Sequence, residues 1–365
     1  MKILVVKVAA IGDFLMATPA LRALKRGGAN EVHLLAGRSI AAVAGSNPDV
    51  DRVFYLDDRR LYRGSLLAKA VETLRVSWRL RRERYDVGFN FHRDRRFAII
   101  LLLAGCRRRI GFRRGLPVPR DRDVGAQQAP PAIDAGRCGR WSWPLTDAVA
   151  VAGVKHHIFH YCDLARALGV FCLDFRMEFP LDGAAESAAA EKFLVPAGLD
   201  DYVVLAPGGA ANVKEEMESR RWPVENFAVL AGLLLAAGRR VVLVGSGADA
   251  GLAARITAEQ PVVVDLTDRT TLAEAAAVLK RSRWVVCNDS GLMHLAAAVG
   301  ARVVALFGPT HPGEKKPLAE GSVAVWKGEG MACAPCYHDG IFPRCGHVSC
   351  LNKISPQEIF ELIIQ

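Results

Sequence analysis

The chain has no apolar run long enough to cross a bilayer. Its first residues, MKILVVKVAAIGD, are interrupted by Lys7 and lead to no small-residue cleavage site, so we interpret them as a strand instead of a signal peptide. The longest apolar stretch elsewhere, residues 97–105, is well short of the roughly 20 residues that a spanning helix needs. We therefore expect a soluble, cytoplasmic protein.

Common catalytic motifs are missing as well. The sequence contains no H-E-x-x-H, no Walker A loop and no G-x-S-x-G, which excludes the usual zinc proteases, P-loop proteins and serine hydrolases. Aromatic residues make up only 7% of the chain. This scarcity argues against a nucleic-acid-binding protein that stacks bases on aromatic platforms, and we predict no nucleic-acid partner.

Charge is distributed unevenly along the chain. Residues 1–180 hold 31 Lys plus Arg against 17 Asp plus Glu, whereas residues 181–365 hold 17 against 21. A basic half joined to a mildly acidic half suggests that only the first half meets a large anion. A solvated, Arg-rich surface without a partner is the alternative.

The pattern predicts two α/β domains, because 365 residues are too many for one ordinary core. Short β-branched runs alternate with amphipathic segments in both halves, which is typical of doubly wound parallel sheets. We set Rossmann-like domains at 1–178 and 179–352, followed by a C-terminal helix at 353–365. Residues 115–143 lack this pattern and are predicted to form a functional or disordered loop. Both domains should present the carboxyl ends of their strands to a cleft.

Two strand-ending segments of the sequence carry candidate chemistry. K-V-A-A-I-G-D ends at Asp13, which either acts as a general base or caps a helix. A-P-G-G-A contributes Gly208 and Gly209, and paired glycines let backbone N–H groups approach a phosphate. The same loop continues to R-R-W-P, where Arg220 and Arg221 offer forked donors to a pyrophosphate. A plain surface turn is the alternative for this loop.

The segment N-D-S-G-L-M-H-L-A-A-A is the most specific motif. It leaves a buried strand and opens a helix, with Asp289 and Ser290 at the cap, Gly291 in the first turn and His294 one turn later. A helix N-terminus binds phosphate through its dipole and unpaired N–H donors. F-G-P-T-H-P ends the next strand, so two adjacent loops predict a nucleotide diphosphate site.

Four of the nine cysteines form a cluster near the C-terminus. Without a secretory signal they do not indicate a disulfide scaffold. Cys333, Cys336, Cys345 and Cys350 are a candidate structural zinc site, and a reduced, solvent-facing cluster is the alternative.

Together these motifs resemble glycosyltransferase family 9, the lipopolysaccharide heptosyltransferases. The resemblance rests on K-V-A-A-I-G-D, A-P-G-G with R-R-W-P, V-V-L-V-G-S-G-A-D, N-D-S-G-L-M-H-L-A-A-A and F-G-P-T-H-P, in that order over nearly the whole chain. It implies a GT-B fold and an inverting, metal-independent transferase. The implied donor is ADP-L-glycero-D-manno-heptose and the implied acceptor is the anionic inner core of lipopolysaccharide. An enzyme acting there would lie on the cytoplasmic face of the inner membrane as a peripheral protein.

The resemblance also implies roles for individual residues. Asp13 matches the general base, and Arg220 matches a basic residue that stabilises the departing diphosphate. The donor-binding loop would comprise Gly208, Gly209, Asp289, Ser290, Gly291 and His294. Nucleoside contacts are expected at Asp249, Thr270 and Leu272, and acceptor contacts at Arg93 and Arg95. Family members with paired threonines contrast with Gly209 and Ala210 here, which leaves the donor sugar open.

Three other interpretations remain at this stage. A family 9 enzyme with another nucleotide sugar or another surface-glycan acceptor would keep every motif. A sugar-nucleotide epimerase of the same fold would keep the cleft without a basic acceptor domain. A non-catalytic protein that binds nucleotide sugars or nucleic acid would use the basic half for binding alone.

Overall fold

The computed structural model describes residues 1–28, 30–113, 143–151, 154–209, 217–337 and 345–364, and the backbone of 133–135. The chain divides into two compact units, Met1–Met177 and Glu178–Gln365. Most of the predicted loop 115–143 lies outside the described residues.

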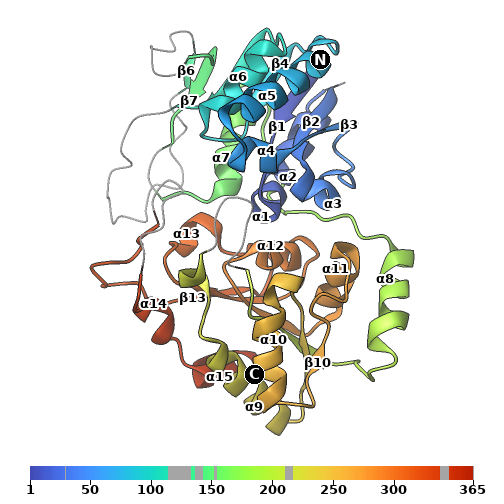
Figure 1. The fold of residues 1–365 in the computed structure, drawn as a ribbon, viewed down its shortest axis with the longest axis vertical. Coiled ribbons are helices and arrows are strands. Elements are labelled where there is room, and N and C mark those ends of the chain that lie inside the picture. The colour runs from blue at the N-terminus through green and yellow to red at the C-terminus, as the bar shows by residue number, and fades with distance from the viewer. Residues whose placement is uncertain are drawn as a thin grey trace. The chain divides into compact units, whose positions relative to one another are not determined.

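Unit 1 is built on a seven-stranded sheet in the order β3-β2-β1-β4-β5-β7-β6 (Figure 1). Neighbouring strands are parallel except for β6, which pairs antiparallel with β7. The strands are β1 Lys2–Val6, β2 Glu31–Gly37, β3 Arg52–Leu56, β4 Val87–Asn90, β5 Arg108–Phe112, β6 Ile133–Ala135 and β7 Asp147–Val149. The helices are α1 Ile11–Leu15, α2 Thr18–Arg26, η1 Arg38–Ile40, α3 Ala41–Ala44, α4 Asp58–Arg63, α5 Leu66–Arg81, α6 Arg95–Leu103 and α7 His157–Arg166.

Unit 2 contains a six-stranded, fully parallel sheet in the order β10-β9-β8-β11-β12-β13. The strands are β8 Tyr202–Ala206, β9 Arg240–Leu243, β10 Val264–Asp265, β11 Trp284–Asn288, β12 Val303–Phe307 and β13 Val323–Trp326. The helices are α8 Gly183–Ala189, η2 Ala190–Leu194, η3 Glu218–Arg220, α9 Val224–Ala236, η4 Gly247–Asp249, α10 Ala250–Glu259, α11 Leu272–Arg281, α12 Gly291–Ala298, α13 Pro312–Lys315, α14 Ser349–Asn352 and α15 Pro356–Ile364.

The two sheets share a Rossmann-like strand order. In each, the chain builds three strands outward in one direction and then returns to add the rest on the other side of the first strand. This reversal creates a switch point between β1 and β4 in unit 1, and between β8 and β11 in unit 2. Ligands of such sheets bind outside the carboxyl ends of the strands at the switch point. The predicted α/β fold class is confirmed.

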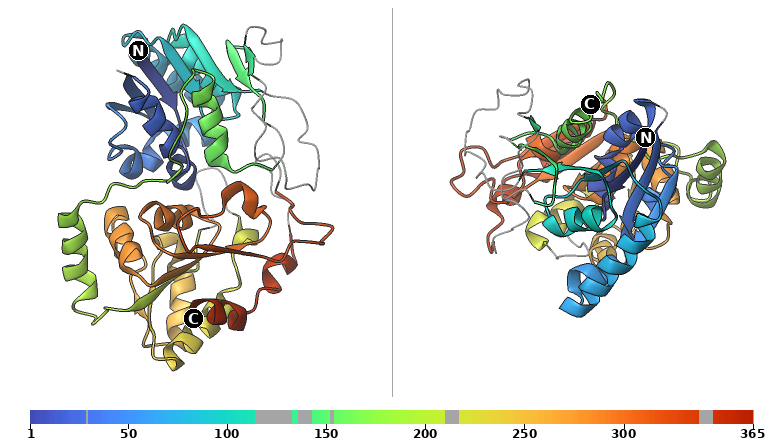
Figure 2. Two further views of the ribbon diagram at one scale, coloured as in Figure 1. Left: turned by 180° about the vertical axis from the view of Figure 1, so that it is seen from behind. Right: turned by 90° about the horizontal axis from the view of Figure 1, so that it is seen from above.

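Burial explains why the central strands read as continuous apolar runs. Helices cover both faces of each sheet (Figures 1 and 2), so every residue of β8, β11 and β12 is buried. The apolar spacing predicts one helix over residues 14–25 and a first strand over residues 2–8, and both bounds were imprecise. The structure has two helices, because proline is tolerated only in the first turn of a helix and Pro19 lies in the first turn of α2. The first strand ends at Val6.

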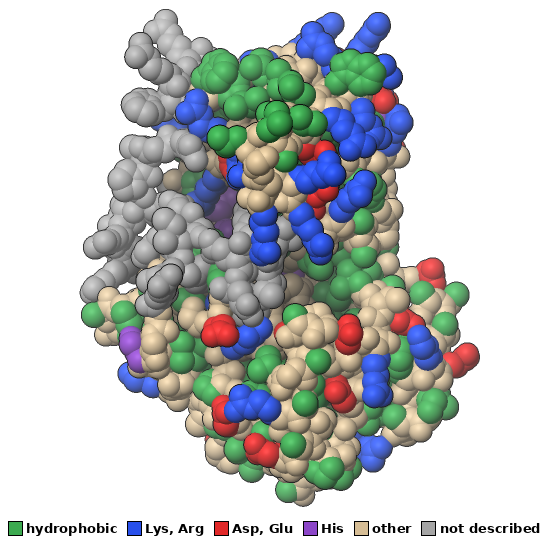
Figure 3. All heavy atoms as spheres, viewed as in Figure 1, with side chains coloured by type: hydrophobic (Ala, Val, Ile, Leu, Met, Phe, Trp, Pro, Cys, Tyr) green, Lys and Arg blue, Asp and Glu red, His purple; other side chains and the backbone are tan. Residues whose placement is uncertain are grey.

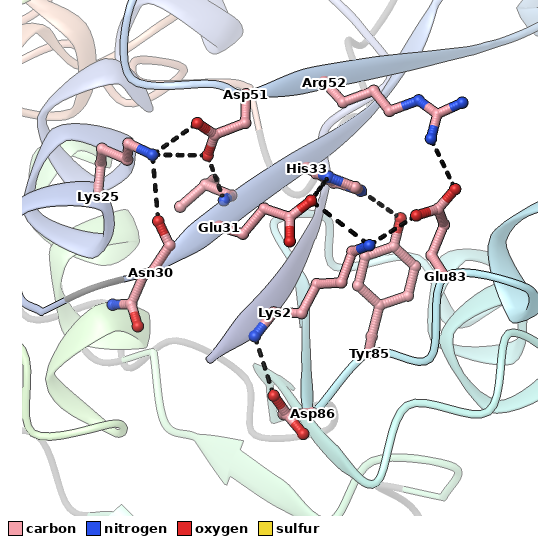
Figure 4. Close-up of polar contacts among 11 residues, drawn as sticks. Lys2, Lys25, Asn30, Glu31, His33, Asp51, Arg52, Glu83, Tyr85 and Asp86 are labelled. Carbon is pink, nitrogen blue, oxygen red and sulfur yellow. Dashed lines mark hydrogen bonds and ion pairs between the residues drawn. The ribbon is translucent and has the colours of Figure 1, made fainter.

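A network of ion pairs joins the amino ends of the strands in unit 1, the end of the sheet opposite the switch-point loops (Figure 4). The Nζ of Lys2 lies 2.7 Å from Glu83, and Arg52 lies 2.7 Å from the same carboxylate. The hydrogen bond from Lys2 lowers the pKa of Glu83. On the adjoining strand His33 contacts Glu31 at 2.8 Å. This end of the sheet is therefore fixed by charge pairing.

Candidate active site

The structure places Asp13 inside the first turn of α1, after the carboxyl end of β1. The N-cap of this helix is Ala10, so the alternative that Asp13 is a helix cap is wrong. Its side chain is 37% exposed. A partly exposed carboxylate at a switch point is able to meet a ligand, as a general base must.

A buried lysine accompanies this carboxylate. The Nζ of Lys7 lies 3.5 Å from Asp13 and donates a hydrogen bond of 2.9 Å to the hydroxyl of Tyr161 on α7. Lys7 itself is only 2% exposed. Its cationic head compensates the negative charge of Asp13 from the protein side, while the carboxylate keeps a face toward solvent. Lys7 was quoted in the motif, but its contact with Asp13 was not predicted.

The other side of the switch point in unit 1 carries the predicted acceptor arginines. Arg93 follows β4 and Arg95 begins α6, and both are exposed. Just before them, the Nε2 of His92 accepts a hydrogen bond of 2.8 Å from the backbone N–H of Val8. This bond joins the ends of β1 and β4, so Asp13 and Arg93 are carried by loops that the histidine ties together.

In unit 2 the equivalent tie is made by Asn288, the last residue of β11. Its amide donates to the carbonyls of Pro207 at 2.8 Å and Gly208 at 3.0 Å, and its carbonyl accepts from the N–H of Trp222 at 2.9 Å. Asn288 is 1% exposed. One side chain thus connects the glycine loop, the arginine loop and the end of β11. Sequence reasoning missed Asn288 and Trp222 as positioning residues.

Both predicted glycines are required by the packing. A Cβ on Gly208 would meet the carboxylate of Asp249 at 2.2 Å, and a Cβ on Gly209 would meet the Cβ of Ser290 at 2.2 Å. Gly209 also has φ +99°, a conformation that side chains with a Cβ rarely adopt. The backbone of the β8 loop consequently lies directly against the start of α12. Ala210 lies outside the described residues.

The predicted diphosphate residue Arg220 pairs with Asp289 at 2.6 Å, where Asp289 is buried and Arg220 is partly buried. Burial by itself raises the pKa of Asp289, but Arg220, Lys315 and His294 outweigh it and the pKa is lowered. The aspartate is therefore held as a carboxylate among three basic side chains. Basic side chains grouped in this way favour an anionic ligand.

Asp249, a predicted nucleoside contact, also takes part in a local capping box. Its carboxylate accepts hydrogen bonds from the backbone N–H of Ser246 at 2.9 Å and from the hydroxyl of Ser246 at 2.8 Å, forming a capping box. Its other oxygen lies 4.0 Å from Arg221. The S-G-A-D spacing is a capping-box signature that was readable from the sequence.

The remaining donor residues belong to two different loops. Ser290, and not Asp289, is the N-cap of α12, where its hydroxyl accepts from the N–H of Met293. His294 lies buried on the same helix. Thr270 and Leu272 follow β10, at the start of α11, and two strands, β9 and β8, lie between β10 and β11. No contact between these two residues and Arg220 is seen in the part of the chain that the structure describes.

The cysteine cluster lies beside the β12 loop. The backbone N–H groups of Cys336 and Tyr337 donate to the carbonyl of Pro309 at 3.0 and 3.1 Å. Burial raises the pKa of the Cys336 thiol, and the neighbouring thiols Cys350, Cys345 and Cys333 raise it further. Within the described residues, however, no group of three or more His, Cys, Asp or Glu side chains is arranged to hold a metal ion.

Comparison with known proteins identifies the family of this chain. The family model of glycosyltransferase family 9 (heptosyltransferase) matches residues 125–341, more than half of the chain. Lipopolysaccharide heptosyltransferase 2 of Salmonella typhimurium is 28% identical over 339 residues, covering 87% of this chain and 86% of that protein. Lipooligosaccharide heptosyltransferase 2 of Haemophilus influenzae is 38% identical over 112 residues, covering 29% of this chain and 32% of that protein. The latter match thus spans about a third of the relative's length.

A solved structure agrees over the full length of the chain. The E. coli ADP-heptose lipopolysaccharide heptosyltransferase II superposes with a TM-score of 0.72 at 22% identity, covering 100% of this chain and 98% of that one. This likeness shows a shared GT-B fold. Within the described residues, no helix has the length and apolar character to span a membrane.

Proposed function

The chain belongs to glycosyltransferase family 9, a family of transferase enzymes, and we propose that it moves a heptose from ADP-L-glycero-D-manno-heptose to the inner core of lipopolysaccharide. The observation that carries this proposal is the pair of Arg220 with the buried Asp289 at the switch point of unit 2. It offers guanidinium donors beside a glycine loop and a helix N-terminus, which suits the diphosphate of a nucleotide sugar. The acceptor and a peripheral place on the inner membrane are parts of the same proposal.

The proposed reaction inverts the anomeric carbon in a single displacement. Asp13 accepts the proton of the acceptor hydroxyl as its oxygen attacks, and the bond from the anomeric carbon to the diphosphate breaks. Negative charge then develops on the departing diphosphate. Arg220 and the N–H groups at the start of α12 stabilise this charge without a metal ion, because they are preorganised before the reaction.

Lys7 contributes to the base in this scheme. It lies 3.5 Å from Asp13, so it places a positive charge beside the proposed base. Because Lys7 is held by Tyr161, its ammonium stays in place while Asp13 takes up the proton. We assign Lys7 a positioning and electrostatic role and Asp13 the proton transfer.

The test is release of ADP from ADP-heptose in the presence of truncated lipopolysaccharide acceptors. Asp13→Asn should lower the turnover rate by about 10²–10⁴-fold while donor binding is retained. Asp51→Asn is a matched control, because Asp51 is 36% exposed and also pairs with a lysine, Lys25, at 2.6 Å. Asp51 lies at the amino end of the sheet (Figure 4), away from the switch point.

Each outcome separates the alternatives. Equal effects of the two substitutions would contradict the base assignment. Release with a different nucleotide sugar but not with ADP-heptose would keep the transferase and change the donor, as Gly209 in place of a threonine allows. Donor interconversion without an acceptor would instead indicate an epimerase, and donor binding without any turnover would indicate a non-catalytic protein.

A structural zinc at Cys333, Cys336, Cys345 and Cys350 is a separate proposal. Thiolates are ligands that zinc prefers, and four of them complete its usual tetrahedral shell. Metal analysis of the purified chain should find about one zinc per chain, lost in the Cys333→Ser, Cys336→Ser double variant. A metal-free wild-type chain would contradict this proposal and leave the catalytic scheme unchanged.

A further inference from the structure

Helix α5 carries an exposed apolar stripe that its own fold does not cover. Leu67, Val71, Leu74 and Trp78 recur at spacings of three and four residues, which places them on one side of the helix. Their exposed fractions range from 52% to 74%, and Leu66 at the start of the helix is 84% exposed. Large apolar side chains that are grouped in this way indicate an interaction surface.

The opposite side of α5 already has its packing partners. Val76 and Leu80 belong to the core of unit 1 together with Phe97 and Ile100 of α6. Glu72 is also buried, where it accepts a hydrogen bond of 2.9 Å from the N–H of Asp57. The stripe is therefore not a core face left open by a missing element, because the helix has a second face that fills that role.

Basic side chains surround the stripe. Within residues 59–84 there are nine Lys or Arg and only two Asp or Glu, namely Glu72 and Glu83. Glu72 is buried and lies 3.7 Å from Arg75, and Glu83 is paired with Lys2 at 2.7 Å and Arg52 at 2.7 Å. The exposed charge around α5 is consequently almost wholly positive. On the face drawn in Figure 3, Lys and Arg side chains likewise gather over unit 1, whereas both signs are mixed over unit 2.

One pair of side chains brings an apolar residue of the stripe and a basic residue into contact. The guanidinium of Arg82 lies over the ring of Trp78, 3.6 Å from its centroid. A tryptophan is suited to the boundary between lipid headgroups and acyl chains, where one part of the ring is wetted and the other is not. An arginine held against that ring would lie at the depth of the phosphate groups.

We propose that α5 is the membrane-docking element of this protein and that its partner is a bilayer surface rich in anionic lipid. The Leu67–Trp78 stripe would enter the headgroup boundary, and Arg75, Arg79 and Arg82 would contact lipid phosphates. In the right-hand view of Figure 2, α5 projects from the remainder of unit 1, which leaves the stripe free to lie on a plane. The inference deepens the proposed function, since a lipid-anchored acceptor requires the enzyme at the membrane.

The positive charge around the stripe favours an anionic bilayer over other binding partners. A second copy of this chain would bring the same basic side chains together, so like charges would oppose pairing through this stripe. An anionic bilayer satisfies the apolar and the basic side chains at once. Each Lys or Arg close to such a surface strengthens binding by roughly fivefold, and each buried leucine by about tenfold or more.

The first experiment is flotation of the full chain with phosphatidylglycerol-containing vesicles at low and high salt. Wild type should float with anionic vesicles, bind phosphatidylcholine vesicles at least tenfold more weakly, and lose binding as salt rises. Leu67→Gln combined with Leu74→Gln should reduce binding at least a hundredfold. The control pair Val195→Gln and Val262→Gln removes similarly exposed apolar side chains from unit 2 and should leave binding unchanged.

A second measurement locates the contact. Brominated lipids quench tryptophans that enter the bilayer, so Trp78→Phe should remove most of the quenching while the chain still floats. Trp143→Phe is its control, because Trp143 is 56% exposed in the same unit against 59% for Trp78. Quenching that persists in Trp78→Phe, or equal flotation of both double variants, would overturn the proposal. So would a dimer that is abolished by the Leu67→Gln, Leu74→Gln pair without any vesicle binding.

The outcome is independent of the catalytic proposal. Vesicle binding is measured without substrate, so a wrong donor or base leaves it unchanged. Conversely, the Leu67→Gln, Leu74→Gln variant should retain ADP release with a water-soluble acceptor fragment and lose it, at least tenfold, with acceptor embedded in vesicles. Equal loss with both acceptors would show that the substitutions damage the enzyme itself and would contradict docking as their cause.

Discussion

Replacing Asn288 should damage unit 2 more than any exposed asparagine, because one buried side chain holds three segments. Asn288→Ala removes three hydrogen bonds of 2.8, 3.0 and 2.9 Å, to Pro207, Gly208 and Trp222. Two carbonyls and one N–H are then left without this partner. At about 1–2 kcal/mol for each stranded group, the loss is roughly 3–6 kcal/mol of the free energy of unfolding. That is a large part of the ~5–15 kcal/mol of a typical domain.

Urea unfolding followed by tryptophan fluorescence measures the effect. The matched control is Asn352→Ala, because Asn352 is exposed and, within the described residues, its side chain donates a single hydrogen bond, of 3.0 Å, to the carbonyl of His347. We expect the control to lose no more than about 0.5 kcal/mol. The affinity for ADP should fall in Asn288→Ala and stay unchanged in Asn352→Ala, since the glycine and arginine loops lose their common anchor. Equal midpoints for the two variants would refute the reasoning.

Asn288→Asp adds a signature in pH. The introduced carboxylate keeps the acceptor for the N–H of Trp222 but faces the carbonyls of Pro207 and Gly208, so burial and repulsion raise its pKa in the folded state. The folded protein then binds more protons than the unfolded chain, and stability falls as pH rises. The deficit against wild type should be smallest near pH 4 and grow toward pH 8. A deficit that does not change with pH would contradict this account.

Two further predictions test other parts of the structure. Gly209→Ala should lower the stability of unit 2 by about 2–4 kcal/mol and weaken ADP binding, because the new Cβ would meet Ser290 at 2.2 Å and φ is +99°. Urea unfolding and ADP titration measure these effects. Wild-type stability and affinity in this variant would contradict the close packing. In unit 1, the hydrogen bond from Arg176 lowers the pKa of Asp174 to about 2, with Arg22 also close by. Asp174→Asn should therefore lower the free energy of unfolding at pH 7. In melting experiments the difference in stability from wild type should shrink as pH falls from about 4 toward 2. A difference that stays constant with pH would show that the charge of Asp174 is not responsible.

The fold was readable from the sequence because burial imposes the pattern. Strands covered on both faces must be apolar throughout, so β8, β11 and β12 stand out as short β-branched runs. Alternation with helices then leaves few topologies, since crossovers between parallel strands are right-handed. Boundaries were less accurate where a single residue decides them, as Pro19 does between α1 and α2.

The site was only partly readable because its supports are distant in sequence. Asp13 was identified by its place after the first strand, but excluding the cap role needed the observation that Ala10 is the N-cap residue of α1, and the base role stays a prediction. The partners of Asn288 lie 66 and 81 positions away, and no local pattern indicates such a bond. The capping box of Asp249, by contrast, is formed with Ser246 three positions earlier, and the S-x-x-D pattern in the sequence indicates it. Hydrogen bonds between residues distant in sequence cannot be predicted from local sequence patterns, whereas capping motifs can.

The shared topology explains why both units need such a tie. Where the strand order reverses, the end loops of the first and fourth strands diverge to opposite faces of the sheet, and nothing in the ladder holds them together. In unit 1, His92 joins these loops by accepting a hydrogen bond from the N–H of Val8. In unit 2, Asn288 joins them by donating hydrogen bonds to the carbonyls of Pro207 and Gly208. In both cases the bond runs from the fourth strand's end to the first strand's loop. The fold thus supplies two equivalent frames, and the proposed chemistry differs because Asp13 is the proposed base in unit 1 and Arg220 the proposed diphosphate contact in unit 2.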